Sequence, residues 1–185
     1  MRLLLATSNP HKVEELRRAL PTWEIDAFTP PDQPPEDGET FEENARLKAR
    51  HARAHAPADA WVAGEDSGIE AAALGGRPGV ESARWAVDGV AALLAALEGE
   101  EDRRARYVCG IVAISPAGEE VVAAGVLEGT VAGEPRGSEG FGYDPIVAPV
   151  GETRTVAELG NAWKSVNSHR ARAAQALARQ LGGIA

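Results

Sequence analysis

A group of acidic residues in the first half of the chain has the composition of a site for a hard divalent cation. Glu36, Glu39 and Glu43 lie in and after a proline-rich segment, and Glu65 and Asp66 follow a short apolar run. Carboxylates suit Mg²⁺, which keeps several waters and needs only one or two of them. Glu39 and Glu43 have a second explanation, because acidic side chains also cap helix N-termini. Asp66 is therefore the strongest candidate ligand, and the contributions of Glu39 and Glu65 stay open.

The segment after the first apolar run contains residue types that bind phosphate groups. It reads Thr7, Ser8, Asn9, Pro10, His11 and Lys12, and a predicted strand passes into a predicted helix there. Backbone N–H groups at a helix N-terminus and small hydroxyl side chains bind phosphate oxygens, and a lysine adds positive charge. The glycines of a P-loop are absent. Taken alone, the segment fits a phosphate site and a simple capped turn equally well.

Two later segments have the composition of a site for a flat, anionic ligand. Phe141 lies between glycines, so the backbone can pass beneath a flat ring while the phenylalanine stacks on it. A tight turn around a buried Phe141 is the alternative. Lys164, His169 and Arg170 gather at the start of the last predicted helix, where positive charge opposes the helix dipole. An anionic ligand beside them would remove that conflict.

Two further histidines and the one cysteine have simpler explanations. His51 and His55 are four residues apart and could in principle share a metal ion. Arg50 and Arg53 surround them, however, and no acidic partner lies one turn away on the helix, so we predict a solvated helix face. Cys109 falls within a predicted strand and is expected to be a small core residue.

Hydrophobic periodicity places these segments on alternating strands and helices. Strands are predicted at residues 2–7, 23–28, 61–64, 106–115 and 120–126, with 127–132 as a candidate continuation. Helices are predicted at residues 10–20, 41–55, 90–97 and 165–181. Early strand–helix–strand alternation followed by consecutive strands predicts an α/β fold with a mixed sheet. Glu65 and Asp66 would then lie at a strand end, where open α/β sheets place their sites.

The composition is that of one soluble domain, spanning residues 1–185. Hydrophobic residues make up 44% and charged residues 25%, and the single cysteine excludes an intramolecular disulfide. The net charge of −9 argues against binding to nucleic acid, although a few cations can still bind a small polyanion. With no signal peptide and no membrane-spanning run, we expect a cytoplasmic protein without a membrane partner.

Taken together, the segments resemble those of the inosine triphosphate pyrophosphatase family. The matching stretches are residues 7–12, 36–41, 43–45, 64–68, 76–84, 141–145 and 168–170, together with Lys48. They occur in the family's order over roughly residues 3–172, and the three lysines of the chain fall inside or beside them. Ser8 and Ala171 depart from the family pattern, because glycine is expected at both positions.

The resemblance implies an ITPase-like, anticodon-binding-like α/β fold, in which a long, bent mixed sheet and two lobes of helices enclose a central cleft, and a homodimer. It implies hydrolysis of ITP, dITP and XTP to the monophosphate and pyrophosphate. Glu36 and Asp66 would hold Mg²⁺, with Asp66 as the base that activates water. Residues 7–12 and Lys48 would hold the triphosphate. The remaining contacts with the nucleotide would come from Ser67, Phe141, Gly142, Tyr143, Asp144, Lys164, His169 and Arg170.

Two other functions remain open at this level. A pyrophosphatase of the septum-inhibitor type, acting on other modified nucleotides, would share the general fold, but residues 168–170 are not expected in it. A nucleotide-sensing module would bind triphosphates without turnover. Such a module has no need of a water-activating carboxylate, so the pair of Glu36 and Asp66 disfavours it.

Overall fold

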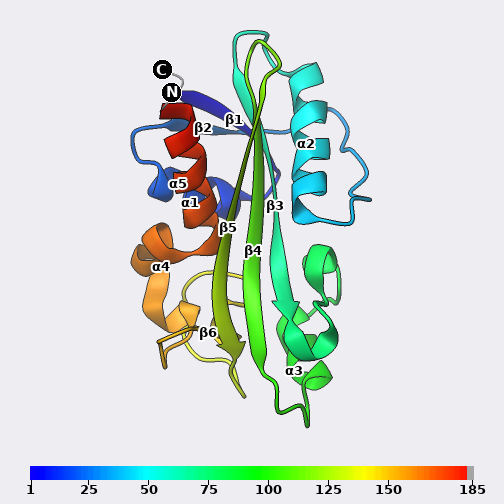
Figure 1. Cartoon of the computed structure of the whole chain (residues 1–185), viewed down its shortest axis with the longest axis vertical. Coiled ribbons are helices and arrows are strands. Elements are labelled where there is room, and N and C mark those ends of the chain that lie inside the picture. Colours follow the sequence, from blue (N-terminus) through cyan, green and yellow to red (C-terminus); the bar gives the residue numbers. More distant parts are fainter. Residues whose placement is uncertain (183–185) are drawn as a thin grey trace.

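A six-stranded mixed sheet runs the length of the molecule in the computed structural model, which describes residues 1–182 (Figure 1). Its strand order is β2-β1-β3-β4-β5-β6. The strand β1 (Arg2–Ala6), next to the edge of the sheet, pairs in parallel with β2 (Glu24–Phe28) and β3 (Trp61–Ala71). The antiparallel part contains β4 (Arg104–Ile114), β5 (Glu120–Val131) and β6 (Val147–Pro149). The predicted α/β fold with a mixed sheet is confirmed, including the continuation of β5 beyond residue 126.

Helices cover both faces of this sheet (Figure 1). One face carries α1 (Pro10–Ala19) and α5 (His169–Gly182), with α4 (Val156–Asn167) beside them. The other face carries α2 (Phe41–His55), and the short α3 (Gly89–Ala96) lies near the far ends of β3 and β4. Each helix layer buries its own apolar cluster, and a third cluster surrounds the far halves of β3, β4 and β5. No helix within residues 1–182 is both long enough and apolar enough to cross a membrane.

Two helices begin where their sequences predict, because capping residues specify the starts. The Asn9 side chain accepts a hydrogen bond from the backbone of His11, and Pro10 follows as the first residue of α1. In α2, Thr40 and Glu43 form a capping box. The capping explanation of Glu43 is therefore confirmed.

The prediction that β3 ends at residue 64 is wrong. The strand continues to Ala71, so Glu65 and Asp66 lie within it and not at its end. Acidic residues and glycine are poor strand formers, which is why the sequence suggested an end there. The pairing of β3 with β4 continues without interruption from Val62 to Ala71, and these long-range hydrogen bonds override the local preference.

The prediction of one helix over residues 165–181 is also wrong. The chain forms two helices, and Ser168 between them is extended, with φ −64° and ψ 160°. The Ser168 hydroxyl accepts a hydrogen bond from the backbone N–H of Ala171 and so caps α5. Lys164 consequently lies in the last turn of α4, where the helix dipole favours a cation, and only His169 and Arg170 lie at a helix start.

Two glycines bring helices close to the sheet at the positions that matter for the site. A Cβ atom on Gly64 would lie 2.0 Å from the Ala45 carbonyl oxygen of α2, and one on Gly125 would lie 2.1 Å from the His169 carbonyl oxygen of α5. Any larger residue would force these helices away from β3 and β5. The close approach packs the small apolar residues of α2 and α5 against the middle of the sheet.

Candidate active site

A cavity of about 380 Å³ opens in the middle of the molecule, where β1 stops and β3 continues. Beyond Gly64, β3 has no β1 residue beside it, so side chains from both of its faces surround the opening. Most of the predicted site residues line this cavity. They are Thr7, Ser8, Asn9, Lys12, Glu36, Lys48, Asp66, Ser67, Phe141, Gly142, Tyr143, Asp144, Lys164, His169 and Arg170.

Of the predicted site residues, Pro10 and His11 do not line the cavity. Pro10 is the first residue of α1, and His11 is exposed behind Phe141. The His11 ring stacks on Phe141 with 5.1 Å between centroids and 22° between planes. These two residues therefore lie at the start of α1 and against Phe141, outside the cavity.

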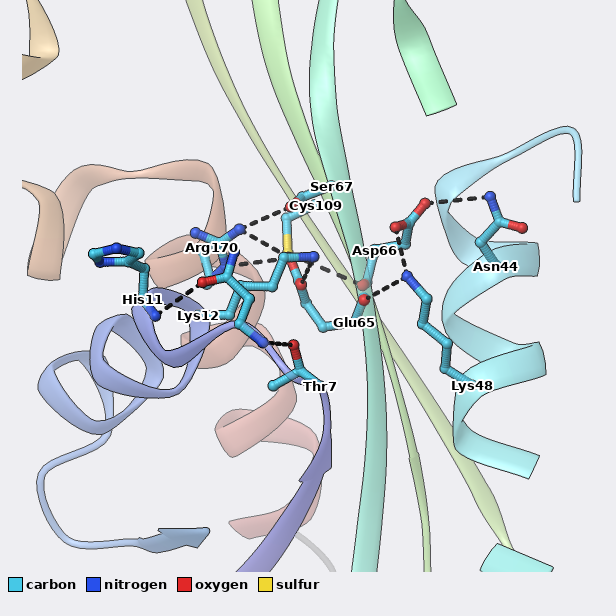
Figure 2. Close-up of polar contacts among 12 residues, drawn as sticks. Thr7, His11, Lys12, Asn44, Lys48, Glu65, Asp66, Ser67, Cys109 and Arg170 are labelled. Atoms are coloured by element: carbon cyan, nitrogen blue, oxygen red, sulfur yellow. Dashed lines mark hydrogen bonds and ion pairs between the residues drawn. The ribbon is translucent and has the colours of Figure 1, made fainter. Parts of the chain in front are cut away.

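Alternation along β3 divides the charged residues of the cavity into two groups (Figure 2). Successive side chains of a strand point to opposite faces. Glu65 and Ser67 point toward α1 and α5, whereas Asp66 points toward α2 (Figure 2). The two adjacent carboxylates therefore have different partners and different chemical roles.

On the α2 side, one ammonium group joins the two carboxylates that were predicted to hold metal. Lys48 Nζ lies 2.8 Å from Asp66 Oδ1 and 2.9 Å from Glu36 Oε1. Asn44 donates to the other Asp66 oxygen at 3.3 Å, and Arg84 contacts Glu36. Glu36 and Asp66 therefore share one cationic partner and face the same part of the cavity.

Burial and ion pairing act differently on these two carboxyl groups. Burial raises the pKa of Asp66, and the nearby Lys48 ammonium offsets this only in part. Burial also raises the pKa of Glu36, but the contacts with Lys48 and Arg84 outweigh it and the net pKa is lowered. Asp66 is thus the better proton acceptor of the two, and Glu36 stays ionised over a wider pH range.

On the other side of β3, Glu65 is fully buried and surrounded by cations. Lys12 Nζ lies 2.6 Å from Glu65 Oε2, and the Arg170 guanidinium donates to Oε1 through Nε at 3.2 Å and Nη2 at 3.1 Å. Burial raises the pKa of Glu65, but Arg170 and Lys12 outweigh it and hold the pKa well below its usual value. Glu65 faces away from Glu36 and Asp66, so it positions cations and is not placed to share their metal ion. The Cys109 thiol, buried as predicted, donates to Oε1 at 3.3 Å.

The end of the cavity opposite Asp66 combines an aromatic ring with positive charge. Lys164 Nζ lies 4.7 Å from the centre of the Phe141 ring, and the Arg170 guanidinium carbon lies 5.6 Å from it. Asp144 is buried and accepts hydrogen bonds from Lys164 Nζ, the Phe141 backbone and the Tyr107 hydroxyl. Asp144 therefore orients Phe141 and Lys164.

Glu15 and Asn44 are two residues of the site that the sequence analysis missed. Glu15 is buried in α1 and contacts Lys164 Nζ at 2.5 Å and Arg170 Nη1. Asn44 is buried in α2 beside Asp66. Spacing could have indicated both, because Glu15 lies three residues after Lys12, and Asn44 lies four before Lys48, which places each pair on one helix face.

Arg170 has little hydrogen-bonding capacity left for a ligand. A guanidinium has five N–H groups. In Arg170 one of them donates to Glu15, two to Glu65 and one to the hydroxyl of Ser67. One N–H, on Nη1, remains for a ligand.

His169 lines the cavity with a stacked, largely buried imidazole ring. Its ring stacks on Tyr107 with 4.6 Å between centroids, and the buried Nδ1 atom has no hydrogen-bond partner among residues 1–182. Burial holds the pKa of His169 well below its usual value, with nearby Arg170 acting in the same direction. The imidazole is therefore neutral at pH 7 and can bind a neutral polar edge of a ligand.

We expect the protein to lose stability below about pH 6.5 because of this histidine. The unfolded chain takes up a proton at His169 that the folded protein does not, so the free energy of unfolding should fall by up to about 1.4 kcal/mol per pH unit below the unfolded pKa. The lowered pKa of Glu65 changes the free energy of unfolding with pH only below about 4.5, the pKa of the unfolded chain, which is outside this window. Urea denaturation at several pH values between about 5.5 and 7.5 measures how the free energy of unfolding changes with pH. This change per pH unit should be smaller in His169→Gln than in the wild type. Equal slopes in the two proteins would contradict the assignment.

Comparisons with known proteins agree over nearly the whole chain. A family model described as the Ham1 family matches residues 3–180. A protein of Bdellovibrio bacteriovorus named dITP/XTP pyrophosphatase is 43% identical, with 98% of each chain covered. A protein of the same name from Symbiobacterium thermophilum is 49% identical over 93% of this chain and 90% of its own length.

Solved structures of similar proteins share the fold. The Ham1 protein of Staphylococcus aureus superposes with a TM-score of 0.87 at 34% identity, covering all of both chains. A HAM1 protein from Coxiella burnetii gives a TM-score of 0.86 at 35% identity, covering 99% of each chain. The arrangement of elements around the cavity is therefore that of these proteins.

Proposed function

The chain belongs to the Ham1 family, and we propose that its cavity hydrolyses non-canonical purine nucleoside triphosphates such as ITP, dITP and XTP to the monophosphate and pyrophosphate. The observation that carries this proposal is the convergence of Glu36, Asp66 and Lys48 at one end of a cavity whose other end holds Phe141, Lys164 and His169. A triphosphate and a purine ring match these two ends in charge and shape. Water breaks the anhydride bond between the α- and β-phosphates.

Glu36 and Asp66 would hold the divalent cation that the reaction uses, and Mg²⁺ suits their oxygen ligands best. The contacts of both carboxylates with Lys48 Nζ support this assignment. When bound, Mg²⁺ would neutralise charge on the phosphate oxygens. A carboxylate pair without cysteine or histidine disfavours softer metals at this position.

Asp66 is proposed as the base that accepts a proton from the attacking water. Its burial raises its pKa toward the range in which a carboxylate is an effective base. Asn44 and Lys48 hold its two oxygens in place through contacts at 3.3 Å and 2.8 Å. The water would then be oriented by a carboxylate that cannot turn freely.

The triphosphate would bind between the N-terminus of α1 and the two lysines. Thr7, Ser8 and Asn9 line the cavity beside the first N–H groups of α1, which favour anions. Lys12 and Lys48 are held by carboxylates on opposite sides of β3. Their two ammonium groups would therefore lie beside the bound triphosphate. Lysine suits this task, because its ammonium acts as a point charge without a fixed fork geometry.

Selection of the base would rest on hydrogen-bond donors at the Phe141 end. The His169 imidazole and the remaining N–H of Arg170 can donate to the 6-oxo group of hypoxanthine or xanthine. Adenine presents an amino group there and would leave these buried donors unpaired. The cavity should therefore reject ATP.

We expect weaker discrimination against GTP than against ATP. Guanine keeps the 6-oxo acceptor and adds only a 2-amino group, whereas adenine replaces the acceptor itself. The loss of kcat/KM relative to ITP should reach about 10⁴-fold for ATP and be smaller for GTP. Steady-state kinetics with the three nucleotides measures this order. A GTP activity below that for ATP would contradict it.

Product analysis with Mg²⁺ present tests the proposed reaction directly. ITP and XTP should give the monophosphate and pyrophosphate, while ATP is left nearly untouched. Release of orthophosphate, or equal use of ATP, would mean that the cavity binds phosphates but performs another reaction. Tight nucleotide binding without turnover would favour the sensing module. Selective use of other modified nucleotides would favour the septum-inhibitor type.

The same proposal includes a two-lobed domain over residues 1–185, a homodimer and a cytoplasmic location. The nucleotide pool that such an enzyme would act on is cytoplasmic. The net charge of −9 supports a small-molecule substrate and no nucleic acid partner.

A further inference from the structure

A second group of metal-binding side chains lies outside the cavity, against α2. One ligand atom from each of Asp32, His51 and His55 lies within 4.8 Å of the others. Asp32 belongs to the segment 29–40, which runs beside α2 (Figure 1). The sequence predicts a solvated helix face here, because no acidic partner lies on the helix itself. Asp32 supplies that partner from the preceding segment.

We propose that Asp32, His51 and His55 bind one Zn²⁺ ion, which fastens the segment 29–40 to α2. Two imidazole nitrogens and a carboxylate oxygen are a typical zinc ligand set, with water in the fourth position. His51 Nε2 lies 3.0 Å from Asp32 Oδ1. Ligand atoms on a tetrahedral zinc ion with bonds of about 2.0 Å are about 3.3 Å apart. This pair is therefore close to the spacing that a shared ion requires. Because His51 Nε2 also lies 3.1 Å from the Asp32 backbone oxygen, binding the ion requires the His51 proton to move from Nε2 to Nδ1.

His55 is already held in the tautomer that zinc requires. Its Nδ1 atom lies 2.9 Å from the backbone oxygen of His51. Because a carbonyl oxygen can only accept, Nδ1 carries the proton and Nε2 keeps its lone pair. Histidines that bind metals commonly donate their second ring nitrogen in this way.

The two arginines beside the cluster are held by other partners. Arg50 donates to Glu120 at 2.6 Å, so its guanidinium is held by another partner. Arg53 donates to the backbone oxygens of Ala56, Pro57 and Ala60. The two cations that argued against a metal in the sequence are therefore both engaged elsewhere.

The proposed zinc site would act on the segment that carries Glu36. Asp32 lies four residues before Glu36, so an ion that joins Asp32 to α2 would restrict how far Glu36 can move from Asp66. The two sites would also bind different metal ions. Imidazole binds Zn²⁺ and suits Mg²⁺ poorly, whereas the carboxylate pair in the cavity suits Mg²⁺.

Calorimetric titration of the metal-stripped, full-length protein with ZnCl₂ tests this proposal. The buffer should contain excess Mg²⁺, which competes for the cavity carboxylates and poorly for imidazole. We expect one Zn²⁺ per chain, with affinity at least about tenfold lower in His55→Ala and in Asp32→Asn. Asp37→Asn, which alters an exposed aspartate of the same segment, is the matched control and should bind zinc as the wild type does.

Replacing Zn²⁺ with Co²⁺ gives a second readout, because tetrahedral Co²⁺ absorbs visible light when histidine binds it. The absorption should be present in the wild type and in Asp66→Asn, and absent in the double variant His51→Ala, His55→Ala. Circular dichroism checks that each variant is folded. The proposal would be overturned by any of three results: the wild type binds no zinc, the double variant still binds it, or Asp66→Asn loses it.

Discussion

Asp66→Asn should lower kcat by about 10²- to 10⁴-fold while nucleotide binding survives. This is the range that a positioned general base contributes. Asparagine keeps the size of the side chain but cannot accept the proton, and Lys12 and Lys48 remain to bind phosphates. Pyrophosphate release measures kcat, and titration with a non-hydrolysable ITP analogue measures Kd. Wild-type turnover in the variant would exclude Asp66 as the base.

The variant also loses a proposed metal ligand, so the experiment must separate two roles. Each kcat should be measured across a Mg²⁺ titration up to saturation. If the loss of kcat persists at saturating Mg²⁺, Asp66 accepts the proton. If kcat recovers fully, the loss came from weaker metal binding alone. Asp59→Asn changes an exposed aspartate between α2 and β3 and should leave kcat unchanged.

Glu65→Gln should lower the free energy of unfolding by about 3–5 kcal/mol, the cost of breaking a buried ion pair. Glu65 is 1% exposed, and its carboxylate is the shared counter-charge of Lys12 and Arg170. Glutamine has the same shape but leaves the buried Arg170 and the mostly buried Lys12 facing a neutral amide. Urea denaturation measures the change, and KM for ITP should rise as Lys12 and Arg170 lose their common anchor.

The same strand supplies a matched control for this prediction. Glu70 of β3 pairs with Arg106 at 2.6 Å, but the two side chains are 25% and 50% exposed. Solvent screens such pairs, so Glu70→Gln should cost no more than about 1 kcal/mol. Similar losses in Glu65→Gln and Glu70→Gln would show that the buried charges are not the source of stability.

Local features of the sequence predicted much of this protein. The capping residues Asn9 and Thr40 specify helix starts within a few residues, so α1 and α2 begin where expected. Of the seventeen predicted site residues, only Pro10 and His11 lie outside the cavity lining. Chemistry-bearing side chains could be recognised because their types and short spacings are visible without the fold.

Elements that depend on distant partners could not be predicted in the same way. The end of β3 was misplaced because hydrogen bonds from β4, about forty residues later, extend the strand past its poor strand formers. The break at Ser168 was missed because neither proline nor glycine marks it, and only the extended backbone and capping hydroxyl of Ser168 separate the two helices. Asp32 and His51 are nineteen residues apart, and no local pattern connects them.

The order of residues specifies which side chains are available and which of them share a short turn or helix face, since these properties depend on covalent neighbours. Their partners depend on the fold. Strand alternation turns Glu65 toward Lys12 and Arg170, which are 158 residues apart, and turns Asp66 toward Lys48. The physical reason is that a buried carboxylate stays ionised only with opposite charges beside it, and folding brings those charges from distant parts of the chain.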